Sequence, residues 1–136
     1  GRDILTNFVL TLHAYNPYLV IVAAAVVGIW GLILFFMKKA TSKIWYYGLY
    51  ITAGLGALQA LLGIILLVFG LKPGKPNDAL YYLHYVYGTI VALGIPIGVT
   101  YATGGKNPRR DVLIFSLAAV VVAAAGVRAL MTGPNN

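Results

Sequence analysis

Apolar residues in this chain are gathered in long blocks, with short polar stretches between them. The apolar runs cover about residues 17–37, 46–71, 80–103 and 112–131. Each run is long enough to cross a hydrocarbon core of about 30 Å as a helix that rises about 1.5 Å per residue. The stretches between them, KKATSK, KPGKPND and GGKNPRR, are short enough to be loops between antiparallel neighbours.

The pattern therefore predicts a single all-α domain over residues 1–136, an integral membrane four-helix up-down bundle. The last helix is expected to begin at Pro108, because Asn107-Pro108 offers a capping residue followed by proline in the first helical position. The same dipeptide, Asn16-Pro17, predicts the start of the first helix. Because a residue before proline disfavours helix, residues 3–14 are expected to form a separate interfacial helix. The expected spanning helices are 17–37, 46–71, 80–103 and 108–131.

Composition agrees with a membrane protein and narrows its chemistry. Hydrophobic residues make up 60% of the chain and charged residues 10%, against about 25% charged in a typical soluble domain. There is no basic stripe interleaved with exposed aromatics, so no nucleic-acid partner is expected. The chain has no cysteine and no glutamate, and it shows no nucleophile-base set or phosphate loop. Any catalysis would belong to a cofactor, which favours an electron carrier over an enzyme and leaves enzymatic activity open.

The distribution of positive charge predicts the orientation in the membrane. The first and third loops hold six of the ten basic residues. By the positive-inside rule these loops are cytoplasmic and both termini face outward, in a membrane of the bacterial inner-membrane type. The six residues are Lys38, Lys39, Lys43, Lys106, Arg109 and Arg110.

Four polar residues lie at membrane depth, where such side chains merit a functional hypothesis. Counted from the cytoplasmic ends at about 1.5 Å per residue, His84 and Arg128 both lie about 30 Å along their helices. Gln59 is expected about one turn below this level and His13 up to two turns above it. The chain's only two histidines and this cation therefore converge in the outer leaflet.

Two histidines on parallel, diagonal helices of a bundle can face each other with a flat macrocycle between them. Histidine is a usual axial ligand of haem iron. We therefore expect His13 and His84 to be the metal ligands of one haem b. Gly88, one turn after His84, would give room to the ring edge, and Arg128 would supply a cation for the haem propionates. Gln59 lies just beneath this level.

Each of these residues also has a purely structural interpretation. A histidine at an interface can simply bond a carbonyl or a lipid. Arg128 can snorkel to the headgroups, and Gln59 can be a polar link between helices. The expected break at Asn16-Pro17 leaves His13 either folded over the bundle top or held at the interface.

Several short motifs resemble a family of small bacterial four-helix membrane proteins of the cytochrome b-like type. They are LHAYNPYLV in the first helix, LQALLGIIL in the second, LHYVYG in the third and a basic residue late in the fourth. More loosely, the chain is similar to a four-helix half of haem A synthase and to cytochrome b561 proteins, in which histidines followed by glycine four residues later hold b-type haem. The resemblance implies ligands at His13 and His84 and places Gln59 against the cofactor. Cytochrome b561 has four ligand histidines for two haems, whereas two histidines allow one bis-histidine haem at most.

The expected function is that of a small membrane b-type cytochrome with one haem near the outer face, exchanging electrons with a quinone or a redox partner complex. The alternative is a non-catalytic accessory subunit of a respiratory or photosynthetic complex, binding another tetrapyrrole such as (bacterio)chlorophyll or none. A transporter or channel is disfavoured, because no carboxylate lies well inside a span. Whether the chain forms a homo-oligomer stays open.

Overall fold

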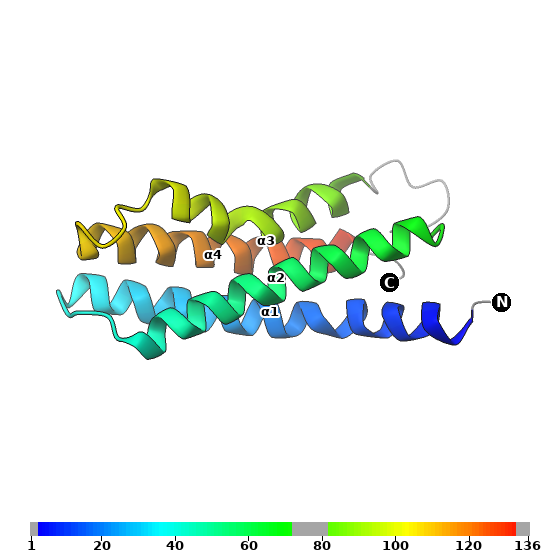
Figure 1. Cartoon of the computed structure of the whole chain (residues 1–136), viewed down its shortest axis with the longest axis horizontal. Coiled ribbons are helices and arrows are strands. Elements are labelled where there is room, and N and C mark those ends of the chain that lie inside the picture. Colours follow the sequence, from blue (N-terminus) through cyan, green and yellow to red (C-terminus); the bar gives the residue numbers. More distant parts are fainter. Residues whose placement is uncertain (1–2, 72–81, 133–136) are drawn as a thin grey trace.

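The computed structural model describes residues 3–71 and 82–132, which form α1 (Ile4–Phe36), α2 (Lys43–Val68), α3 (Tyr82–Tyr101) and α4 (Pro108–Thr132). The helices alternate in direction, with the α1–α2 and α3–α4 loops at one end of the bundle and the start of α1 and the end of α4 at the other (Figure 1). α1 packs against α2 and α4, and α3 packs against the same two helices. α1 and α3 therefore lie on a diagonal, and the all-α four-helix bundle is confirmed.

All four helices are long and apolar enough to cross a membrane. Large apolar side chains cover their outer surfaces, and Val22, Ile51 and Ile64 are 62%, 61% and 59% exposed. Exposure of this kind along every helix is compatible with lipid as the surrounding medium. The chain is accordingly an integral membrane protein whose outer surface meets the bilayer.

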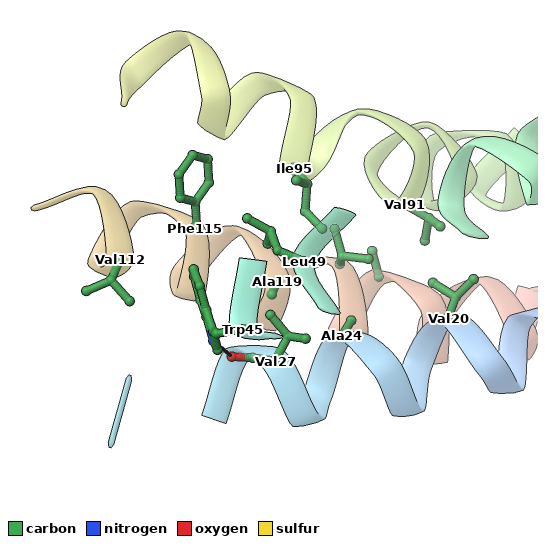
Figure 2. Packing of buried hydrophobic residues seen from close by; sticks show 12 residues of the cluster. Val20, Ala24, Val27, Trp45, Leu49, Val91, Ile95, Val112, Phe115 and Ala119 are labelled. Carbon is green, nitrogen blue, oxygen red and sulfur yellow. Dashed lines mark hydrogen bonds between the residues drawn. The ribbon is translucent and has the colours of Figure 1, made fainter. Parts of the chain in front are cut away.

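The main core lies in the half of the bundle nearest the two short loops and is organised around Trp45. The Trp45 side chain is fully buried, and its indole Nε1 donates a hydrogen bond of 3.1 Å to the carbonyl of Val27 (Figure 2). This bond satisfies the polar atom of a large buried aromatic ring and ties α2 to α1. Buried residues packed in the same cluster include Val20, Ala24, Leu49, Ile95, Phe115, Ala119 and Val122.

Small residues allow α1 and α4 to approach each other closely, which is a usual basis of helix packing in lipid. A Cβ added at Gly31 would overlap the Ser116 hydroxyl and lie 2.7 Å from the Trp45 ring. A Cβ added at Gly28 would lie 2.8 Å from a methyl group of Val120. Glycine at these positions is therefore required by the distance between the two helices.

The α3–α4 loop is held by a buried carboxylate. Asp111 is 2% exposed and accepts hydrogen bonds from the Thr103 amide at 2.7 Å, the Thr103 hydroxyl at 2.9 Å and the Gly105 amide at 3.0 Å. Asn107 caps α4 as expected, since its Oδ1 accepts from the Arg110 amide at 3.1 Å.

The expected start of the first helix at residue 17 is wrong. α1 is continuous from Ile4 through Pro17, so residues 3–14 do not form a separate interfacial helix. Asp3 provides the N-cap, accepting from the Thr6 amide at 2.7 Å, and this bond lowers the pKa of the Asp3 carboxyl. A proline inside a helix is tolerated where a neighbouring helix satisfies the backbone group that it leaves free.

The other boundaries differ by a few residues from the expected ones. α2 begins at Lys43 because Ser42 caps it, its Oγ accepting from the Trp45 amide at 3.3 Å. α3 covers Tyr82–Tyr101, and residues 80 and 81 of the expected span lie outside the described residues. α4 ends one residue beyond the expected position.

Replacing Gly31 with alanine is expected to destabilise the bundle by about 1–3 kcal/mol, the usual cost of overpacking a filled core. The added Cβ would overlap Ser116 and press on Trp45. Unfolding by SDS in mixed micelles, followed by tryptophan fluorescence, measures the effect. Gly54→Ala is the matched control, because within residues 3–71 and 82–132 a Cβ at that position would meet no atom of another helix within 4 Å. Equal stability of the two variants would contradict the close approach of α1 to α4.

Candidate functional site

The two histidines meet across the diagonal of the bundle. The ring centres of His13 on α1 and His84 on α3 lie 6.1 Å apart, and the ring planes make an angle of 76°. Both side chains are half-buried. The expectation that His13 lies up to two turns farther out than His84 is wrong. At the end of the bundle with the α1–α2 and α3–α4 loops, α1 reaches beyond the end of α3 (Figure 1). Counting from the helix ends therefore overstated the offset.

Gln59 on α2 contacts His13 twice. Its Nε2 lies 3.0 Å from the Nδ1 of the His13 ring and donates to the His13 backbone carbonyl at 2.9 Å. That carbonyl would ordinarily accept from the amide four residues later, but Pro17 occupies that position and has no N–H. Gln59 thus satisfies the carbonyl that Pro17 leaves free, and it is a polar link between helices that also contacts the histidine ring.

Asn16 belongs to the same network, although the sequence interpretation gave it only a capping role. It is 7% exposed, and its Nδ2 donates to the Gln59 Oε1 at 2.9 Å and to the Leu55 carbonyl at 3.1 Å. Residues three apart lie on one face of a helix, so the spacing of His13 and Asn16 is the signal that could have identified it. α1 therefore carries two polar residues directed at α2.

His84 is oriented by the backbone of α4. Its Nδ1 lies 3.0 Å from the carbonyl oxygen of Ala129. Because a carbonyl can only accept, the Nδ1 of His84 carries a proton, and in the neutral ring the Nε2 then holds the free electron pair. The partner is a backbone atom, so the type of side chain at position 129 gives no indication of this contact.

Arg128 is adjacent to Ala129, which places it at the level of His84, but its side chain lies on the surface. The guanidinium is 5.5 Å from the centre of the Tyr87 ring, and Nη1 is 3.7 Å from the Met131 sulfur. The cation is thus near the histidine pair along the bundle axis and remains accessible from outside.

Two glycines determine the space around the histidines. A Cβ added at Gly88, one turn after His84, would meet no atom of another element within 4 Å among the described residues. A Cβ added at Gly63 on α2 would lie 3.2 Å from the Cε1 of His13. The His13 ring therefore lies against the backbone of α2, while the position of a side chain at residue 88 of α3 is unfilled.

The site has few metal-ligating groups. Within residues 3–71 and 82–132, no cluster of three or more His, Cys, Asp or Glu side chains could hold a metal ion. In this part of the chain the histidine pair offers at most two ligands. A metal bound there would need its remaining ligands from a cofactor or from solvent.

Comparisons with known proteins do not assign the chain to a family. No family model, curated protein or solved structure matches it. The site is therefore interpreted from the geometry of its own residues.

Proposed function

We propose that this chain is a small membrane b-type cytochrome that binds one haem between His13 and His84 and transfers electrons. The observation that supports the proposal best is that the only two histidines of the sequence face each other with ring centres 6.1 Å apart. They come from diagonal helices, so a flat group between them would lie within the bundle.

This separation suits two imidazoles on opposite sides of one metal ion. A metal–imidazole bond is about 2.0–2.1 Å long, so two rings whose centres are 6.1 Å apart could hold one metal ion between them. The ring planes make an angle of 76°, and binding of one metal ion by both histidines would not require the two planes to be parallel.

His84 already has the hydrogen bonding of an axial ligand. Ligating histidines usually donate their second ring N–H to a carbonyl or carboxylate, which fixes both the tautomer and the ring orientation. The bond from Nδ1 to the Ala129 carbonyl has this form. His84 would therefore bind through Nε2 without any change of its own contacts.

The surroundings also suit a tetrapyrrole. The open space beside Gly88 could accept the edge of a macrocycle. Arg128 is exposed at the level of the pair and could bind haem propionates as a charge-assisted partner. When bound, haem supplies one-electron chemistry, and the residues of this chain hold it, orient it and limit access of water.

One observation favours a second candidate. Gln59 presents an amide nitrogen to the Nδ1 of His13, which leaves His84 as the histidine already set for ligation. A single axial histidine is enough for the magnesium of a (bacterio)chlorophyll. The chain could then be a non-catalytic accessory subunit of a respiratory or photosynthetic complex.

We further propose a bacterial-type inner membrane with the histidine pair near the outer face. Six of the ten basic residues lie in the α1–α2 and α3–α4 loops or in the first turn of the helix that follows each loop. This end of the bundle is opposite the start of α1 and the end of α4 (Figure 1), and the positive-inside rule makes it cytoplasmic. His13 lies about 35 Å along α1 from this end at about 1.5 Å per residue. A quinone or a redox partner complex would then exchange electrons at the outer face.

The first test is the absorption spectrum of the detergent-purified protein, with and without dithionite. Low-spin b-type haem is expected in the wild type. His84→Ala should remove haem, and His13→Ala should leave a five-coordinate, high-spin species because one ligand remains. Thr89→Ala is the control on α3, since its exposed hydroxyl donates to the Tyr85 carbonyl of its own helix. Unaltered low-spin spectra in both histidine variants would contradict the assignment.

Arg128→Leu is expected to weaken haem retention a few-fold, as an exposed ion pair contributes up to about 1 kcal/mol. Loss of a cation near the iron should also lower the midpoint potential, because a positive charge favours the reduced form. Arg128→Lys should keep part of both effects. Haem transfer to apomyoglobin and a redox titration measure them. Retention and potential equal to wild type in Arg128→Leu would exclude contact with the propionates.

The orientation is tested separately from the cofactor. A protease-cleavable tag at the C-terminus of the full chain should be cut when protease is added outside intact spheroplasts. The variant Lys106→Cys, in the α3–α4 loop, should be labelled by an impermeant maleimide only after lysis. The opposite pattern would place the histidine pair near the cytoplasmic face.

A further inference from the structure

The orientation of the Gln59 amide is determined by its neighbours. Its Nε2 faces the His13 carbonyl at 2.9 Å, and its Oε1 faces the Nδ2 of Asn16 at 2.9 Å. The Nδ2 of Asn16 also faces the Leu55 carbonyl, at 3.1 Å. Backbone carbonyls only accept hydrogen bonds. Two carbonyls thus terminate the chain of amides, and reversing either amide would place oxygen against oxygen.

This orientation determines the state of the His13 ring. The Nε2 of Gln59 lies 3.0 Å from the His13 Nδ1, and an amide nitrogen only donates. The Nδ1 of His13 must therefore accept, and a neutral imidazole then carries its proton on Nε2. His84 is the opposite case, because its Nδ1 donates to the Ala129 carbonyl and its Nε2 is unprotonated.

We infer that Gln59 is a positioning residue that holds His13 in the Nε2–H tautomer when the site contains no cofactor. The histidine pair then offers one N–H donor and one free electron pair. An axial bond to His13 needs an electron pair on its Nε2, so His13 becomes a ligand only after the Gln59 amide turns. This last step rests on the proposed function, whereas the tautomers of the two rings do not.

Pro17 also contributes to the orientation of the Gln59 amide. If residue 17 had an N–H, this N–H would donate to the His13 carbonyl within α1, and the carbonyl would not need Gln59. A residue with an N–H at position 17 should release the amide while leaving both His13 and Gln59 in place. The orientation of the His13 proton is thus coupled to a proline on the same helix.

The test is a two-bond ¹H–¹⁵N correlation spectrum of haem-free, [¹⁵N]histidine-labelled protein in detergent. Wild type should show the His13 proton on Nε2 alone and the His84 proton on Nδ1. In Gln59→Leu and Pro17→Ala, signals of the Nδ1–H tautomer of His13 should appear as well. Pro96→Ala is the matched control, since it also removes a proline from inside a helix, on α3, and should leave His13 unchanged.

Stopped-flow addition of haem supplies the second readout. In wild type a five-coordinate species should form first and become low-spin as His13 binds. In Gln59→Leu and Pro17→Ala the second step should be about two- to ten-fold faster, as expected for the loss of one hydrogen bond.

The inference is overturned if the His13 proton of the wild type lies on Nδ1. It is also overturned if the His13 tautomer is the same in wild type, Gln59→Leu and Pro17→Ala. A wild type that shows the expected tautomers and binds no haem would instead refute the proposed function, so the two failures are distinguishable.

Discussion

The carbonyl of His13 cannot be satisfied within its own helix, because Pro17 has no N–H to give it. In hydrocarbon an unsatisfied backbone carbonyl costs several kcal/mol of free energy, so a donor from another helix is needed. Gln59 provides it at 2.9 Å, which sets the register of α2 against α1 at this level. The same amide then meets the His13 ring and Asn16. The absent N–H of Pro17 thus accounts for the polar contacts between α1 and α2, and these contacts allow α1 to continue through the proline.

This polar centre separates two apolar regions of the bundle. On the side of the short loops, the large cluster around Trp45 and Ala24 packs all four helices together. On the side of the termini, a small cluster of Val9, Leu62 and Leu66 joins α1 to α2. The histidine pair lies where the tight packing of the first region ends. A cofactor site is more easily accommodated there than beside Gly31, where even a methyl group would collide with α4.

Hydropathy was enough to predict four spanning helices, because in lipid the backbone can only be satisfied within helices or closed barrels. The same topology predicted that the two histidines lie on a diagonal. Local capping rules were less transferable, as the two Asn-Pro dipeptides show. The Asn107 side chain bonds the first turn of its own helix, α4, whereas the Asn16 side chain bonds α2 and the helix continues past it. The roles of Asn16 and the Ala129 carbonyl depend on tertiary neighbours, which no local pattern in the sequence contains.

The two histidines differ in the kind of atom that orients them, and this difference bears on how a ligand pair can work. His84 is oriented by a backbone carbonyl in the last turn of α4, whose direction is set by the helix itself. His13 is held by a side-chain amide, which can rotate if its own partners are replaced. If haem binds, His84 would hold it with its present contacts, whereas His13 would hold it only after a rearrangement of Gln59 and Asn16. Binding by His13 would then depend on the packing between α1 and α2. A change at that helix interface could therefore alter the ligation of the metal from a distance.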